Sequence, residues 1–105
     1  MTDKTVYLIR HGQARHNVAF DTHGADAFMM EEFRDPCLTT TGEDQCAKAK
    51  EQFPELQDAD VVFVSPLKRT LRTAELIFYQ HPNMCTLDLI REIDYHYTCN
   101  KRPEE

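Results

Sequence analysis

The fold is decided by the stretch Val61-Val62-Phe63-Val64-Ser65-Pro66-Leu67-Lys68-Arg69. Its first half is a β-branched and aromatic run without polar alternation, which predicts a buried strand at residues 60–65. Pro66 then stands at the favoured first position of a helix, with Ser65 as its N-cap. Apolar residues continue at helical spacing to about residue 79. A strand that leads directly into a helix is therefore expected here.

Segments on both sides of this stretch also alternate between predicted strands and predicted helices. The sequence predicts strands at residues 4–10 and 86–91, a helix at residues 42–53, and an irregular segment at residues 18–37 with a short helix near residues 25–33. Thr40 or Thr41 can cap the helix at 42–53, and Pro54 stops it. The order strand, helix, strand, helix, strand predicts an α/β fold with a parallel sheet.

Composition limits the classes of protein to which the chain can belong. Its 105 residues, 41% of them hydrophobic and 29% charged, are typical of one globular domain. The net charge is −6, which argues against nucleic-acid binding because that affinity depends on an excess of Lys and Arg. No stretch approaches the roughly 18 apolar residues of a membrane span, and the N-terminus lacks the apolar region of a signal peptide. A cytoplasmic protein without a membrane partner is expected.

The four cysteines favour reduced thiols over disulfides or a metal site. Their spacing is irregular and includes no C-x-x-C pair. A zinc site could be assembled from His81 and Cys85 with His96 and Cys99, but these spacings are loose and paired ligands are missing. The sequence therefore favours buried thiols.

Three polar segments directly follow the three predicted strands, at residues 10–12, 65–69 and 91–92. Ligands of parallel sheets bind at the carboxyl ends of the strands, so these segments predict the position of a site. His11 would present its imidazole there, and Arg10 and Arg69 could bind phosphate oxygens near a helix N-terminus. Glu92 would add a carboxyl group. A nucleophile, cations and an acid suit phosphoryl transfer.

The same residues resemble the histidine phosphatase (phosphoglycerate mutase-like) superfamily. The resemblance rests on Leu8-Ile9-Arg10-His11-Gly12-Gln13 with Asn17, on Leu38-Thr39-x-x-Gly42-x-x-Gln45-Cys46, on residues 61–74 and on Arg91-Glu92. The segments at residues 16–18, 35–38 and 99–102 further resemble a eukaryotic phosphatase-like branch. The resemblance implies the N-terminal portion of a three-layer α/β/α domain, and phosphomonoester hydrolysis without a metal or other cofactor.

The resemblance also implies a role for individual residues. His11 would attack phosphorus and carry a phosphohistidine, while Arg10 and Arg69 would hold the phosphoryl oxygens. Glu92 would protonate the leaving oxygen, and burial together with bound phosphate would favour its protonated form. Asn17 would hydrogen-bond the phosphoryl group.

Three other residues belong to the predicted substrate-binding set. Gln13 would lie near the phosphoryl group beside Asn17. Lys101 and Arg102 could steer an anionic substrate toward the pocket. The expected substrate is a phosphorylated small molecule or a phosphoprotein.

A second family histidine, which follows a later strand, has no counterpart in this sequence. The single domain at residues 1–105 is therefore expected to be incomplete at its C-terminus. His16 and His96 are candidates for a substitute, but neither occupies the family position.

Three alternatives remain open. The first is phosphoglycerate-mutase activity. Two features argue against it: the sequence contains no Trp, and the residues around the predicted acid are Ile90-Arg91-Glu92-Ile93. The second is a non-catalytic binding module. The third is a fragment that self-associates through an uncovered sheet edge.

Overall fold

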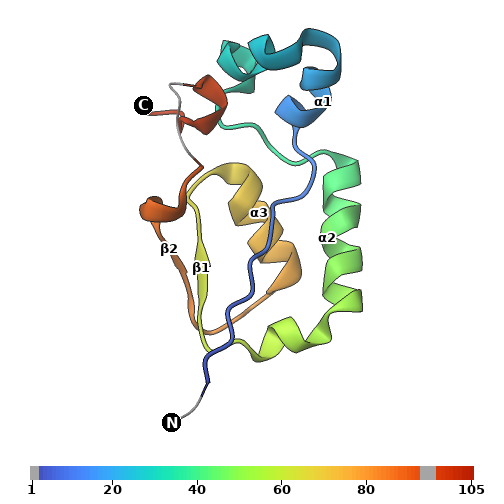
Figure 1. The fold of residues 1–105 in the computed structure, drawn as a ribbon, viewed down its shortest axis with the longest axis vertical. Helices are drawn as coiled ribbons and strands as arrows, with labels where there is room; N and C mark the ends of the chain where they lie inside the picture. Colours follow the sequence, from blue (N-terminus) through green and yellow to red (C-terminus); the bar gives the residue numbers. More distant parts are fainter. Residues whose placement is uncertain (1–2, 93–96) are drawn as a thin grey trace.

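A computed structural model of the chain describes residues 3–92 and 97–105 (Figure 1). The regular elements are α1 (Arg15–His23), α2 (Thr40–Gln52), β1 (Val62–Val64), α3 (Lys68–Ile77) and β2 (Met84–Thr86). Short 3₁₀ helices lie at Gly24–Met29, Glu31–Phe33, Pro54–Asp58, Asp88–Ile90 and Thr98–Asn100. None of the helices in these described ranges is long and apolar enough to cross a membrane.

The sheet consists of β1 and β2, which pair in parallel with Val62 opposite Met84 and Val64 opposite Thr86. The Leu87 N–H extends the ladder by donating to the Val64 carbonyl at 2.8 Å. The connection between the two strands contains α3, which packs beside them (Figure 1). A parallel strand pair joined by a helix confirms the predicted α/β class.

The main core lies between the sheet and helices α2 and α3. Ile77 on α3 is almost fully buried, and Leu67, just before that helix, is fully buried. The buried residues that share this core are Ala14, Leu38, Cys46, Leu56, Val62, Val64, Ala74, Ile77 and Phe78. The sequence prediction of α3 by its helical spacing is thus confirmed, with its start moved from Pro66 to Lys68.

The prediction of a buried strand at residues 4–10 is wrong. Residues 3–13 have no regular secondary structure. Ala14, which follows them, forms an isolated bridge with Leu38. Val6 and Leu8 are 77% and 93% exposed. Strand propensity reflects packing and pairing with neighbours, and neither β1 nor β2 pairs with this segment. The predicted self-association through an uncovered edge is not tested by a single chain and stays a prediction.

Three smaller predictions also differ from the structure. The predicted third strand corresponds to β2, which occupies Met84–Thr86 instead of residues 86–91. A 3₁₀ helix at Asp88–Ile90 lies in the second half of the predicted range. The short helix near 25–33 is two 3₁₀ helices. Helix α2 is capped by Thr39 instead of Thr40 or Thr41, because the Thr39 hydroxyl accepts the Gly42 N–H at 3.0 Å.

A second cluster, formed by α1 and the 3₁₀ helices at 24–29, 31–33 and 98–100, lies above the sheet (Figure 1). Asp35 joins this cluster to α3, because its buried carboxylate accepts the Lys68 N–H at 2.8 Å. The Thr98 hydroxyl donates to the Met29 carbonyl at 3.1 Å, which ties the C-terminal segment to the same cluster. The two parts face each other across the carboxyl end of β1, where the candidate site lies.

Candidate active site

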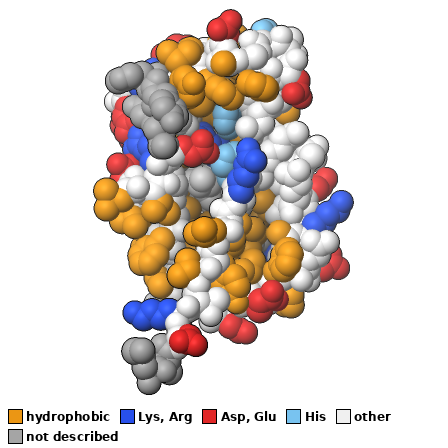
Figure 2. All heavy atoms as spheres, in the orientation of Figure 1, with side chains coloured by type: hydrophobic (Ala, Val, Ile, Leu, Met, Phe, Trp, Pro, Cys, Tyr) orange, Lys and Arg blue, Asp and Glu red, His pale blue; other side chains and the backbone are white. Residues whose placement is uncertain are grey.

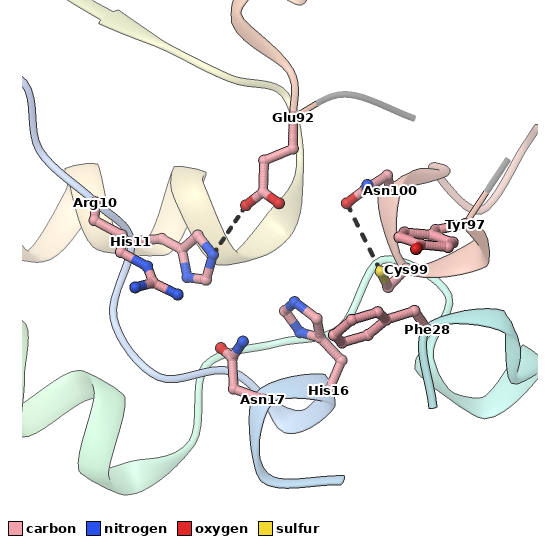
Figure 3. Close-up of a pocket in the computed structure, with 9 residues that line it drawn as sticks. All are labelled: Arg10, His11, His16, Asn17, Phe28, Glu92, Tyr97, Cys99 and Asn100. Atoms are coloured by element: carbon pink, nitrogen blue, oxygen red, sulfur yellow. Dashed lines mark hydrogen bonds and ion pairs between the residues drawn. The ribbon is translucent and has the colours of Figure 1, made fainter. Parts of the chain in front are cut away.

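A cavity of about 360 Å³ lies between the segment at residues 10–12, helix α1 and the C-terminal segment. In Figure 2 histidine atoms lie in this hollow, between a basic and an acidic side chain. Figure 3 shows the residues that line it, which are Arg10, His11, His16, Asn17, Phe28, Glu92, Tyr97, Cys99 and Asn100. Four of the predicted site residues (Arg10, His11, Asn17 and Glu92) therefore share one cavity.

A hydrogen bond with the backbone of Gly12 orients the His11 ring. Its Nδ1 lies 2.6 Å from the Gly12 carbonyl oxygen, and its side chain is 6% exposed. A carbonyl oxygen can only accept a hydrogen bond, so Nδ1 carries a proton. The other ring nitrogen, Nε2, faces Glu92 Oε1 at 3.2 Å. The ring is thereby oriented with Nε2 toward the cavity, which is the orientation that a nucleophile requires.

The segment that carries His11 is fixed by α2 and α3. The Gly12 N–H donates to Thr73 Oγ1 on α3 at 3.1 Å, and the Gln13 N–H donates to Gln45 Oε1 on α2 at 2.9 Å. A Cβ atom on Gly12 would lie 2.6 Å from the Gly42 carbonyl oxygen. Glycine at position 12 therefore allows a backbone approach that a larger residue would prevent.

Glu92 is ionised in the ligand-free site. The hydrogen bond from His11 is the largest cause that lowers its pKa, to about 2, and the charge of Arg69 acts in the same direction. Burial acts in the opposite direction and is outweighed, since the side chain is 53% exposed. The expectation that burial favours a protonated Glu92 is thus wrong for the site without ligand. The hydrogen bond between His11 Nε2 and Glu92 Oε1 requires one proton between these two atoms, because the ionised carboxylate can only accept.

Arg69 lies behind the cavity wall. Its side chain is fully buried, and its guanidinium donates to the Cys99 carbonyl at 2.7 Å and to Asn100 Oδ1 at 2.5 Å. Its Nη2 is 3.5 Å from Glu92 Oε1. The cation thus holds residues 99–100 and Glu92 at the rim. Its predicted contact with phosphate oxygens stays a prediction.

Arg10 and Asn17 face the cavity directly (Figure 3). Arg10 is exposed, and no carboxylate among residues 3–92 and 97–105 forms an ion pair with it. Asn17 lies in the first turn of α1, where its Oδ1 accepts the Ala14 N–H at 2.9 Å. An unpaired guanidinium and an amide at a helix start are suited to an anionic ligand.

The remaining predicted residues lie outside this cavity. Gln13 lines a smaller adjoining hollow, and its Oε1 accepts from the Thr39 hydroxyl at 2.7 Å. Arg102 pairs with Glu104 at 2.9 Å, and the charge of Lys101 acts on Glu31. The structure therefore does not bring Lys101 and Arg102 to the cavity.

Five lining residues were not predicted as site residues: His16, Phe28, Tyr97, Cys99 and Asn100. Phe28 and Tyr97, with ring centroids 5.4 Å apart, form an aromatic side of the cavity. His16 lies between them and His11, whereas the sequence analysis named it only as a candidate substitute. Its position one residue before Asn17 was the available signal. His96 falls outside the described residues.

No group of three or more His, Cys, Asp or Glu side chains suited to a metal ion occurs within the described ranges. The cluster of chemistry-bearing groups consists instead of imidazoles, a carboxylate and guanidinium groups. Such a set can bind an oxyanion and move a proton.

These features define the class of the protein: an α/β protein in which the side chains of Arg10, His11 and Glu92 line one cavity. The sequence comparison agrees, since the model of the histidine phosphatase superfamily (branch 1) matches residues 6–105. The chain belongs to this superfamily.

The curated proteins to which the chain is similar include plant and bacterial proteins named as phosphatases. The chain is 34% identical over 96 residues to "Probable 2-carboxy-D-arabinitol-1-phosphatase" of Arabidopsis thaliana, covering 90% of this chain and 18% of the relative. It is 37% identical over 79 residues to "5''-phosphoribostamycin phosphatase" of Niallia circulans, covering 73% and 34%. It is 34% identical over 91 residues to "Uncharacterized phosphatase PhoE" of Bacillus subtilis (strain 168), covering 86% and 42%.

The chain spans less than half the length of each of these relatives. No solved structure matches the chain significantly.

Proposed function

We propose that the chain carries the nucleophile and the general acid of a phosphomonoester hydrolase. The observation that supports this most directly is the 3.2 Å contact between His11 Nε2 and Glu92 Oε1, two residues that are 81 positions apart in the sequence. The names of the relatives support a phosphatase that acts on phosphorylated small molecules. A phosphoprotein substrate and the cytoplasmic location stay predictions.

The first step transfers the phosphoryl group to the protein. A bound phosphate dianion raises the pKa of the adjacent Glu92 carboxyl, so the shared proton moves from His11 Nε2 to Glu92. Nε2 then attacks phosphorus, the bond from phosphorus to the ester oxygen breaks, and Glu92 gives its proton to that oxygen. The alcohol leaves, and a phosphohistidine remains on His11.

The second step returns the protein to its starting state. Water attacks the phosphorus atom and gives a proton to the Glu92 carboxylate, the bond between Nε2 and phosphorus breaks, and inorganic phosphate leaves. Arg10 and Asn17 would hold the phosphoryl oxygens during both steps, with Arg69 supporting Glu92 and contributing positive charge. Lys101 and Arg102 would act only at long range, by attracting the anionic substrate.

An Arg10→Ala variant tests the anion-binding part of this proposal. Removing the Arg10 cation from the cavity is expected to lower kcat/KM for p-nitrophenyl phosphate roughly 10- to 100-fold, because charged hydrogen bonds to phosphate are lost. Inorganic phosphate should inhibit the variant correspondingly less.

Arg15→Ala is the matched control, because Arg15 lies nearby but stacks over the Phe33 ring at 5.4 Å and does not line the cavity. Equal effects of the two substitutions would contradict a phosphate site at Arg10. A folded wild-type chain without any turnover of p-nitrophenyl phosphate would refute hydrolase activity of this chain.

A further inference from the structure

His16 is a buried imidazole at the cavity that the proposed mechanism does not use. It lies in the first turn of α1 and is only 4% exposed. Its ring centroid is 6.0 Å from that of His11 and 5.8 Å from that of Phe28. Figure 3 shows the outer edge of the ring pointing into the cavity, toward the space between His11 and Glu92.

The hydrogen bonding of His16 is incomplete. Its Nδ1 is buried and has no hydrogen-bond partner within residues 3–92 and 97–105. A buried polar atom without a partner is costly, and few occur in native proteins. An apolar ring would pack against Phe28 equally well. The cost of the unpartnered Nδ1 therefore indicates that the imidazole is present for its other nitrogen, Nε2, and not for packing.

The protonation state of His16 suits a hydrogen-bond donor. Burial is the largest cause that lowers its pKa, and the positive charges of Arg69, His11 and Arg10 act in the same direction; against the opposing charge of Glu92, these causes together lower the pKa to about 4. At neutral pH the ring is thus uncharged and carries one proton. Because Nδ1 meets no acceptor in the described chain, the proton is best placed on Nε2, at the edge of the ring that faces the cavity.

We propose that His16 is a further substrate-binding residue, which donates its Nε2–H to an oxygen of the phosphoryl group held beside His11. This inference rests on the proposed phosphatase function and adds a donor to it on the side of the cavity opposite Glu92. A neutral donor binds a phosphoryl oxygen without competing with His11 for the Glu92 carboxylate.

The test compares His16→Phe and His16→Gln with the wild-type chain. Phenylalanine keeps an aromatic ring against Phe28 but removes the donor, whereas glutamine keeps an N–H donor. Inhibition by inorganic phosphate and kcat/KM for p-nitrophenyl phosphate are measured at pH 7. His16→Phe is expected to weaken both roughly 10- to 100-fold, the range for a hydrogen bond to a charged group. His16→Gln should recover a substantial part of the loss.

Thermal melting and a matched variant separate binding from folding. The melting temperature of His16→Phe is expected to equal or exceed that of the wild type, because the buried unpartnered nitrogen is gone. His23→Phe, an exposed position on the same helix, should leave both kinetic values unchanged.

Unchanged phosphate inhibition in a folded His16→Phe variant would overturn the inference and leave His16 a packing residue. Equal losses in His16→Phe and His16→Gln would also overturn it. A wild-type chain that neither binds phosphate nor turns over substrate would instead refute the underlying phosphatase proposal.

Discussion

Substituting alanine for His11 is expected to lower kcat for p-nitrophenyl phosphate by about 10⁴-fold or more. The substitution removes the atom that forms the bond to phosphorus, and removal of a covalent nucleophile causes losses of this order. Phosphate binding should weaken far less, because Arg10 and Asn17 remain at the cavity. Steady-state kinetics and phosphate inhibition of the purified variant measure both effects.

His23→Ala serves as the control for this prediction, because His23 is exposed at the end of α1 and does not line the cavity. Far-UV circular dichroism and thermal melting establish that both variants are folded. Residual turnover of more than about a tenth of the wild-type rate in a folded His11→Ala variant would contradict a nucleophilic role, given the much larger loss expected.

Glu92→Gln is expected to lower kcat about 10²- to 10⁴-fold for alkyl phosphates, which is the contribution typical of a general acid. The loss should be smaller for p-nitrophenyl phosphate, because p-nitrophenolate leaves without needing a proton. Rates for a series of phosphate esters, plotted against the pKa of the leaving alcohol, measure this difference. The variant should show the steeper dependence.

The same substitution has an effect on stability whose sign follows from the pKa of Glu92. In the folded chain this pKa is about 2, below the ordinary value of 4.5, so the ionised carboxylate stabilises the fold above pH 4.5. That stabilisation is lost as the pH falls through 2. Glu92→Gln should therefore reduce the melting temperature at neutral pH, and less so in strong acid.

Glu43→Gln is the control, because Glu43 is a half-buried residue that pairs with Arg72 at 3.5 Å and does not line the cavity. An identical loss of rate for good and poor leaving groups in Glu92→Gln would contradict the role of Glu92 as the acid.

The sequence predicted those parts of the fold that local pattern determines. The strand before Ser65 is a continuous apolar run, and the helix after it and helix α2 have apolar residues at helical spacing. Each has a clear boundary signal, and all three exist. The segment at residues 4–10 has the same strand pattern, but neither β1 nor β2 pairs with it, so propensity alone was misleading. Helix α1 was missed because its apolar residues do not form a stripe along one face.

The motifs of the sequence predicted part of the site, and the contacts that depend on distant segments were predicted less well. Arg10, His11, Asn17 and Glu92 meet at one cavity, as the motif order indicated. The burial of Arg69 against Cys99 and Asn100 could not be predicted, because it depends on the path of the C-terminal segment. The low pKa of Glu92 likewise depends on one distance to His11, which only the structure provides.

The central claim is that a phosphohistidine forms on His11. The most direct measurement incubates the chain with an excess of a phosphate ester, quenches the reaction rapidly in alkali, where phosphohistidine is stable, and locates any phosphoryl group by peptide mass spectrometry. We predict phosphorylation of the peptide that contains His11, appearing before the steady state and disappearing as substrate is exhausted. Turnover by the wild type without a phosphoryl group on His11, or with one on another residue, would contradict the account.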